Sequence, residues 1–529
     1  MSSAARAAGG AAGASRDAAK PPLAGAFRPA AAARQPLAAG ARPWSRAKRY
    51  VFLLHRWLGI GTCVLIALWF ASGIVMMYVE YPELTEQERL DALPPLELAR
   101  ARLGPAEAAA ALDAPSGAPV RLRLTSVLGR PAYELAHADG RARIVFADDG
   151  ARLDGVTAEQ ALDAARRSGF DAVAPRHAGT VDIDQWTVSS PLDRHRPLHK
   201  IELGDPAGTV LYVSGTTGQI VRDTNRRERF WNWLGSTIHW IYPWQLRRHA
   251  ELWANLVIAL SLVGLVSIAS GALVGWWRLR LKRRYRSGVT PYRGVMKWHH
   301  LLGLGSLVFL ATFMLSGLLS LGPWGVFANA TSAADAIERY TGGRPSALDS
   351  VPPLAALEAG VKEIEWARLG GAEYWIASYS ADERVAVDAD GPVSASELRA
   401  RIERALPAML PDAALVRSET IAVYDDYYYT HHNRYRPLPV LRAVFADPER
   451  SWFHVDLETG QVVNRMTATD RVARWLYNGL HSLDLAWLFQ RRPLWDVVVI
   501  VLCAIGVVFS ATSVWIGWRR LARSGRRAT

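Results

Sequence analysis

The chain has 529 residues, half of them hydrophobic, and a formal net charge of +13. The positive charge gathers at the ends of long apolar segments, at 48–49, 278–297 and 519–527. This distribution is typical of a membrane protein anchored on anionic lipid, and it argues against a nucleic-acid-binding protein.

Four apolar segments, at 51–79, 252–277, 301–321 and 494–518, are each long enough to cross a membrane. A hydrocarbon core about 30 Å thick needs about 20 helical residues. We therefore predict a membrane α-helical protein with four transmembrane helices, at 48–80, 249–279, 297–322 and 493–519.

The positive-inside rule predicts the orientation of these helices. It places both termini and the 280–296 loop in the cytoplasm, in a multi-pass protein of a bacterial inner membrane. The long segments 81–228 and 323–468 are then periplasmic domains, followed by outer-face interfacial segments at 229–248 and 469–492. Residues 1–47 are rich in Ala, Gly, Arg and Pro, which predicts a disordered cytoplasmic tail, and residues 520–529 form a second tail.

The sequence repeats itself, which predicts two halves built on one plan of helix, outer domain and helix. At an offset of 244, His55, Gly59, Gly61, Ser72 and Gly73 match His299, Gly303, Gly305, Ser316 and Gly317. At an offset of 242, Gly218, Gln219, Trp233, His239 and Trp253 match Gly460, Gln461, Trp475, His481 and Trp495. Both halves have the same topology, so their symmetry axis is expected along the membrane normal.

The outer segments predict α+β domains. Alternating apolar residues lead into turns at Asp149-Gly150 and Thr217-Gly218, as in β-hairpins. Ala-rich helical stretches precede them at 105–112 and 157–166, and similar helical stretches occur at 353–361 and 394–405 in the second segment. A short helix followed by a few antiparallel strands, four times over, fits this pattern.

Several stretches resemble one known family. They are LLHRWLGIG at 53–61, HHLLGLG at 299–305, the segment 480–502, the TGQ strand ends at 217–219 and 459–461, and the sequences around Asp426-Tyr427-Tyr428 and RYRPLP. Over about 48–520 the chain resembles the PepSY-associated transmembrane-helix family of iron-regulated membrane proteins. The resemblance implies PepSY-like units at about 100–154, 157–222, 351–392 and 394–465, and studied relatives are inner-membrane ferric-siderophore reductases with b-type haem.

Two histidine pairs recur in register, His55 with His299 and His239 with His481, and the resemblance makes them candidate axial ligands of two b-haems. Neutral imidazole is a common haem ligand. The glycines that follow four residues after His55 and His299 share a helix face with them and would leave room for a porphyrin. His300 is the alternative to His299, and the opposing interpretation is that all these histidines are interfacial residues copied by duplication.

The polar and aromatic stretch at 424–439 is a second candidate site. Asp426, Tyr427, Tyr428, Arg434 and Arg436 could bind a ferric chelate, although tyrosine-rich strands also pack sheets well, and we favour that structural interpretation. The neighbouring His431 and His432 have no histidine counterpart in the first half.

Other chemistries are excluded by missing motifs. The sequence holds no GxGxxG dinucleotide loop, P-loop or HExxH zinc motif, and no CxxC for a covalent haem or an iron–sulfur cluster. The expected function is that of an inner-membrane oxidoreductase that passes electrons from a quinol or an unidentified donor to a periplasmic acceptor such as a ferric siderophore. The alternatives are a non-redox, peptide- or protease-binding regulatory membrane protein and a siderophore permease.

Overall fold

The computed structural model describes residues 43–112, 119–343, 348, 350–430 and 435–525. Packing divides the chain into two compact units, Met1–Tyr50 and Val51–Thr529, and every contact described below lies within the second. Most of the predicted N-terminal tail, up to residue 42, lies outside the described residues. Residues 43–47 and 520–525 belong to helices.

Three helices are long and apolar enough to cross a membrane: Trp44–Met76, Ala250–Arg278 and Leu494–Arg523. They belong to α1 (Pro43–Met76), α8 (Ala250–Arg278) and α15 (Leu494–Gly525). The membrane segments expected at these three places are therefore present as single helices.

The predicted fold class, with four transmembrane helices, is wrong. The third apolar segment is split into α9 (Val295–Gly305) and α10 (Leu307–Leu319), which are bent by 65°. The break falls at Ser306, whose buried hydroxyl donates to the carbonyl of Leu302 at 2.5 Å. Such back-bonding from serine bends helices, and apolar composition does not reveal it. The predicted α+β domains are present, and three antiparallel sheets make up much of the fold.

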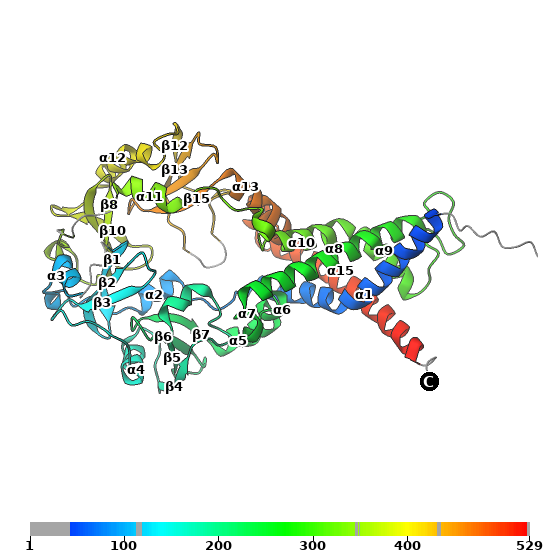
Figure 1. The fold of residues 1–529 in the computed structure, drawn as a ribbon, viewed down its shortest axis with the longest axis horizontal. Helices are drawn as coiled ribbons and strands as arrows, with labels where there is room; N and C mark the ends of the chain where they lie inside the picture. Colours follow the sequence, from blue (N-terminus) through cyan, green and yellow to red (C-terminus); the bar gives the residue numbers. More distant parts are fainter. Residues whose placement is uncertain (1–42, 113–118, 344–347, 349, 431–434, 526–529) are drawn as a thin grey trace, which may run out of the picture. The chain divides into compact units, whose positions relative to one another are not determined.

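One seven-stranded antiparallel sheet joins the two halves of the chain, in the order β11-β10-β9-β8-β1-β2-β3. At its centre β1 and β8 pair antiparallel, with Leu124 opposite Ile364 (Figure 1). The first sheet of each half is therefore part of a single sheet. Its strands are β1 (Arg121–Val127), β2 (Arg130–Ala136), β3 (Ala142–Phe146), β8 (Glu363–Leu369), β9 (Ala372–Ser378), β10 (Arg384–Asp388) and β11 (Gly391–Pro392).

Each half also has a four-stranded antiparallel sheet of its own. In the first half it consists of β4 (Arg176–Val181), β5 (Leu198–Glu202), β6 (Val210–Ser214) and β7 (Ile220–Thr224). In the second half it consists of β12 (Leu415–Ile421), β13 (Val440–Phe445), β14 (Trp452–Asp456) and β15 (Val462–Met466). Most strands of the second half begin 242 residues after their counterparts, so the repeat in the sequence is a repeat in the fold.

Short helices connect the sheets to one another and to the membrane helices. In the first half they are α2 (Glu86–Ala92), η1 (Leu98–Arg100), α3 (Pro105–Ala110), α4 (Ala158–Arg167), η2 (Ser190–His195), α5 (Arg226–Leu234), α6 (Ser236–His239) and α7 (Trp244–Arg247). In the second half they are η3 (Pro323–Gly325), α11 (Ala333–Thr341), η4 (Leu354–Ala356), α12 (Ala395–Ala405), η5 (Leu406–Met409), α13 (Ala468–Arg474), the π-helix η6 (Trp475–Ser482) and α14 (Ala486–Phe489). The segments α5–α6 and α13–η6 position the candidate site.

The apolar cores follow this arrangement. One core contains residues of both halves, among them Leu122, Leu124, Ile364 and Trp375, packed on the seven-stranded sheet. Separate cores lie under α4 and under α11 and α12. Because one core is shared, the two halves are expected to fold as a single cooperative unit outside the membrane.

The central strand pair carries opposite charges at equivalent positions of the repeat. Arg121 and Arg123 of β1 correspond, at the offset of 242, to Glu363 and Glu365 of β8. Across the antiparallel pair, Arg123 lies 3.0 Å from Glu363 and Arg121 lies 2.9 Å from Glu365. The strands that the duplication made equivalent are therefore complementary in charge.

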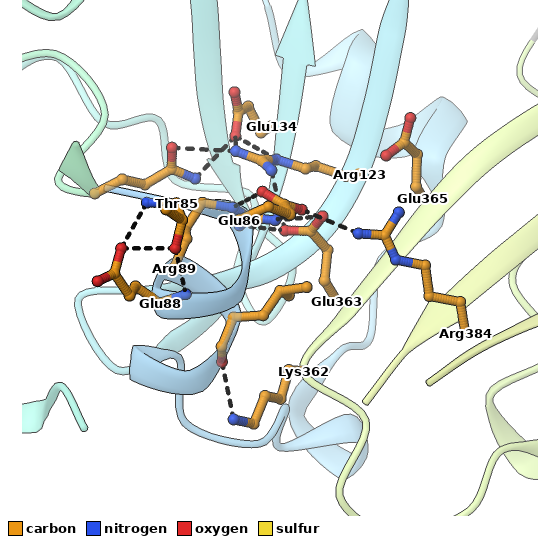
Figure 2. Close-up of polar contacts among 12 residues, drawn as sticks. Thr85, Glu86, Glu88, Arg89, Arg123, Glu134, Lys362, Glu363, Glu365 and Arg384 are labelled. Carbon is orange, nitrogen blue, oxygen red and sulfur yellow. Dashed lines mark hydrogen bonds and ion pairs between the residues drawn. The ribbon is translucent and has the colours of Figure 1, made fainter. Parts of the chain in front are cut away.

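The Arg123–Glu363 pair belongs to a buried network (Figure 2). Arg123 also donates to Glu134 at 2.7 Å, and Arg89 of α2 donates to Glu363 at 2.8 Å. Gln219, from the repeated TGQ turn, donates to Glu134 at 2.8 Å. Buried charges are tolerated when they are paired in this way. The network therefore fixes how α2, the seven-stranded sheet and the β4–β7 sheet of the first half pack together.

Candidate functional site

His239 and His481 come together where the helices meet the sheet domains, and we name them the domain-side pair. His239 ends α6 and His481 lies in the π-helix η6. Their ring centroids are 6.0 Å apart, with an angle of 71° between the rings. The repeat in the sequence thus brings two equivalent histidines side by side, with their rings nearly perpendicular.

Serines of α1 and α10 contact both rings of the domain-side pair. The Nδ1 of His239 lies 3.1 Å from the hydroxyl of Ser72 and 3.1 Å from the carbonyl of Trp69. The Nδ1 of His481 lies 3.1 Å from the hydroxyl of Ser316 and 3.2 Å from the carbonyl of Phe313. Ser72 and Ser316 match each other in the repeat, as do Trp69 and Phe313.

These contacts determine the tautomer of the two imidazoles. A carbonyl can only accept a hydrogen bond, so each Nδ1 must carry the proton. The Ser72 hydroxyl agrees, because it donates to the carbonyl of Leu68 at 2.7 Å and can accept from the ring. The Nε2 of each ring is then unprotonated and carries a free lone pair.

His55 and His299 form the loop-side pair, near the connection between α8 and α9. Their ring centroids are 6.3 Å apart, with an angle of 30° between the rings. The Nδ1 of His55 lies 3.1 Å from the carbonyl of Ser267. The Nδ1 of His299 lies 3.2 Å from the hydroxyls of Thr512 and Ser513, both of which donate to a main-chain carbonyl. Here too Nδ1 is the protonated nitrogen.

The spacing of both pairs fits two ligands on one metal ion. Two metal–nitrogen bonds of about 2 Å, with each nitrogen about 1 Å from its ring centroid, place collinear imidazole centroids about 6 Å apart. Among the residues that the structure describes, no Nε2 of these four histidines has a hydrogen-bond partner. Ligating histidines commonly donate the other ring N–H to a carbonyl or similar acceptor, as all four do here.

His300 has a different role from its neighbour His299. Its Nε2 lies 2.9 Å from the carbonyl of Gly275, and its Nδ1 lies 2.7 Å from the hydroxyl of Thr290. Both ring nitrogens are therefore occupied, and the buried ring fastens the loop between α8 and α9 to the end of α8. Of the two candidates left open by the sequence, the geometry favours His299.

Glycines adjoin the histidine rings, but not the ones expected. A Cβ at Gly271 of α8 would stand 2.6 Å from Cε1 of His55, and a Cβ at Gly317 would stand 3.3 Å from Cε1 of His481. Gly59 has no neighbouring atom within 4 Å, whereas a Cβ at Gly303 would meet the ring of Phe509. That ring stacks on His299 at 5.0 Å. The absence of a side chain at Gly271 and Gly317 thus leaves space for the imidazole rings. The spacing of residues along one helix does not predict this contact between helices.

The chain passes through a left-handed residue two positions after each domain-side histidine. Ile241 has φ 52° and Leu483 has φ 54°. Positive φ is rare for large side chains, and for a β-branched isoleucine it is costly. Backbone strain of this kind is often found at functional sites, and the same position is strained in both halves.

The tyrosine-rich stretch is mostly structural. Tyr428 is buried, stacks on His454 at 4.8 Å and donates to the carbonyl of Pro437. Arg436 lies over the ring of Tyr428 at 5.5 Å, and Asp426 accepts from the main-chain N–H of Ala486. Arg434, His431 and His432 lie outside the described residues.

Tyr427 contacts the start of the π-helix η6. Its hydroxyl accepts from Nε1 of Trp475 at 3.1 Å, and Trp475 begins the π-helix that carries His481. The stretch therefore supports η6 from the domain side. Chelate binding by these residues remains a prediction.

In the described part of the chain, no group of three or more His, Cys, Asp or Glu residues could hold a metal ion.

His454 lies away from the membrane helices. Burial and the nearby Arg442 lower its pKa to about 3, so this histidine stays neutral. Its Nε2 accepts from Arg442 at 2.8 Å. His454 therefore has a structural role in the packing of the β12–β15 sheet.

Three membrane-length helices, α+β sheet domains and two pairs of neighbouring histidines define a membrane protein with an internal repeat. The chain belongs to the family described as PepSY-associated TM region, which matches residues 52–520. Comparison with curated proteins found no match. The resemblance seen in the sequence is confirmed, and it extends over nearly the whole described chain.

Proposed function

We propose that the protein is a b-haem electron-transfer protein of a bacterial inner membrane, in which the loop-side and domain-side histidine pairs each supply the two axial ligands of one haem. The observation that carries the proposal is the shared geometry of the two pairs. Each pair has centroids about 6 Å apart, Nδ1 atoms donating to helix carbonyls or hydroxyls, and Nε2 atoms free. A bound haem would supply reversible one-electron chemistry at its iron.

The protein's part is to hold the imidazoles and keep water away. Ser72, Ser316 and the helix carbonyls fix the tautomer that leaves Nε2 free to bind a metal. Phe70, Phe309 and Phe313 contact one another between the helices, and Phe313 also contacts the ring of His481. An apolar, closely packed surrounding of this kind is one of the means by which a protein tunes a haem potential.

The two pairs are spaced to carry charge across a bilayer. On α1, His55 belongs to the loop-side pair and Trp69 contacts the domain-side pair. Their separation of 14 positions corresponds to about 21 Å of helix. That distance is most of a hydrocarbon core of about 30 Å. Two sites at these levels could together take an electron from one face to the other.

The direction of transfer follows from the predicted orientation. The charge distribution supports a cytoplasmic loop between α8 and α9 and periplasmic sheet domains. Electrons would enter from a quinol or an unidentified donor and leave to a periplasmic acceptor. We propose a ferric siderophore as acceptor, because reduction to ferrous iron weakens a chelate of hard oxygen ligands.

The test is the absorption spectrum of the full-length protein, purified in detergent, before and after dithionite. We expect a Soret band and reduced α bands of a low-spin b-haem, with about half of the intensity lost in His299→Ala. His300→Ala is the matched control, because it alters the adjacent residue without touching Nε2 of a proposed ligand, and it should keep the full intensity. A wild-type protein without a Soret band would refute the proposal. The non-redox alternatives, peptide binding and siderophore transport, would then become the functions to test.

A further inference from the structure

Arg474 is a buried arginine whose guanidinium is only partly satisfied. It ends α13 and is 6% exposed. Its Nη2 donates to the main-chain carbonyl of Asp484. Its Nε and Nη1 have no hydrogen-bond partner, and among the arginines that the structure describes it is the only one with two such atoms.

A guanidinium in this state is energetically costly. An unpaired buried donor loses its bound water without replacement, and the loss is greater for a charged group. The nearest carboxylate oxygen, Oδ1 of Asp426, is 3.8 Å from Nη2, and the Asp426 side chain is 41% exposed. That contact is too long for a hydrogen bond and leaves the other two nitrogens without a partner.

The guanidinium lies next to the turn that carries His481. A Cβ at Gly479 would stand 3.6 Å from Nη1 of Arg474, and Nη2 contacts Asp484. These contacts fall two residues before and three residues after His481 in the chain. The rings of Trp475 and Tyr429 lie over the guanidinium at 4.2 Å and 5.2 Å, which fixes its plane.

In the first half of the chain, the residue equivalent to Arg474 has a structural role. The counterpart of Arg474, at the offset of 242, is Asn232. Its amide donates to the carbonyls of Glu80 and Glu228 and accepts from the hydroxyl of Ser236, so its side chain is fully used. The second half places a long cation with spare donors where the first half places a satisfied amide.

We propose that Arg474 binds a carboxylate of the ligand held by the domain-side pair. On the function proposed above, on which this inference rests, that carboxylate is a haem propionate. Nη2 keeps a second hydrogen beside its bond to Asp484, so a carboxylate can pair with Nη2 together with either Nε or Nη1, the bidentate manner in which arginine binds carboxylates. A haem held by His481 would carry two propionates, and Arg474 contacts the residues that flank this histidine in the chain. Arg474 is then a positioning residue that also compensates the charge of the cofactor.

The experiment compares full-length wild-type protein with Arg474→Gln, Arg474→Lys and Arg471→Gln. Arg471 is the matched control, because it lies one turn earlier on α13 and its guanidinium donates to the carbonyls of Met466 and Arg450 instead. The first readout is the rate at which haem passes from the detergent-solubilised protein to an excess of apomyoglobin. We expect one of two haems to leave about tenfold faster from Arg474→Gln, the effect of losing one charge-assisted bond. Arg474→Lys should restore part of the difference, and Arg471→Gln should match the wild type.

The second readout is the pH dependence of the reduction potential of the same haem. With Arg474 in place the propionate stays ionised and the potential should vary little between pH 6 and 8, whereas Arg474→Gln should make it depend on pH. A third measurement needs no substitution. Haem labelled with ¹³C in the propionates should give an ionised-carboxylate band in redox-induced infrared difference spectra.

Three outcomes separate the possibilities. Equal haem loss and equal pH profiles in Arg474→Gln and Arg471→Gln would overturn the inference and leave the haem function intact. If Arg474→Gln does not fold, a protonated propionate band in the infrared spectrum of the wild type would overturn it. A wild-type protein without haem would refute both the inference and the proposed function.

Discussion

The buried ion network at the centre of the seven-stranded sheet offers a stability test. We predict that Glu363→Gln strongly destabilises the sheet domains. Glu363 is 3% exposed and accepts from Arg89 at 2.8 Å and from Arg123 at 3.0 Å. Glutamine keeps the shape but removes the charge, so the buried guanidinium of Arg123 and the half-buried one of Arg89 lose their shared counter-ion.

The size of the effect follows from general values for buried pairs. Removing one partner of a buried ion pair costs about 3–5 kcal/mol, because the remaining charge is uncompensated. Arg123 and Arg89 keep Glu134 and Glu86 as partners, which favours the lower end of that range. For a folding unit of about 250 residues, about 3 kcal/mol corresponds to a Tm lower by about 6 °C, and the joined sheet domains are slightly larger.

The stabilisation by Glu363 should also depend on pH. Burial alone raises the pKa of this carboxyl. Arg123 and Arg89 lower the pKa by more than burial raises it, so it lies well below its usual range. A group with a depressed folded pKa stabilises the fold above its unfolded pKa, which is about 4.3 for glutamate. The difference in Tm between wild type and Glu363→Gln should therefore be full at pH 7 and shrink below about pH 4.

The assay is thermal unfolding in detergent, followed by tryptophan fluorescence, with Glu365→Gln as control. Glu365 lies two residues along the same strand, on the same face, but its partner Arg121 is 45% exposed. Exposed pairs contribute about 0–1 kcal/mol, so the control should lose little. Equal Tm values for Glu363→Gln and Glu365→Gln at pH 7 would refute the argument that burial of the charges decides the cost.

Three further predictions concern single residues. Ser72→Ala and Ser316→Ala should each retain haem but shift the reduction potential of the domain-side haem, measured by spectroelectrochemistry, because the ring N–H loses one acceptor; unchanged potentials would contradict the assigned contacts. Gly271→Ala should displace the imidazole of the loop-side pair and halve the haem content, whereas Gly61→Ala, with no atom within 4 Å of the new Cβ, should not; equal haem content would contradict this. Burial and neighbouring carboxylates raise the pKa of Asp223 to about 7, so the destabilisation grows as the pH rises from the unfolded pKa of about 3.9 to about 7 and is full above it, and Asp223→Asn should raise Tm more at pH 8 than at pH 4; a gain independent of pH would be contrary evidence.

The sequence predicted the paired histidines because the repeat is visible without structure. A polar residue that recurs in register inside apolar segments stands out, and this drew attention to His55, His239, His299 and His481. The α+β content of the sheet domains was also predictable, since alternation and turn residues are local signals. The role of Ser72 and Ser316 was missed although their recurrence was noted, because a contact between distant helices cannot be deduced from one sequence.

Long-range features escaped prediction for the same physical reason. The pairing of β1 with β8 joins residues 240 apart, and nothing local indicates that arginines on one strand meet glutamates on the other. The bend at Ser306 depends on a single hydroxyl within an apolar segment. Arg474 was overlooked because the repeat replaces it by asparagine, so comparison of the halves favours residues that the halves share.

The most direct test of the central account is the haem-to-protein ratio of the full-length protein and of variants that remove one histidine from each pair. The account predicts two b-haems per chain in the wild type, one in His299→Ala and one in His481→Ala, and none when both are replaced. The remaining haem in each single variant should be low-spin by electron paramagnetic resonance, as two axial imidazoles require. A ratio that stays at the wild-type value in either single variant would contradict the assignment of that pair.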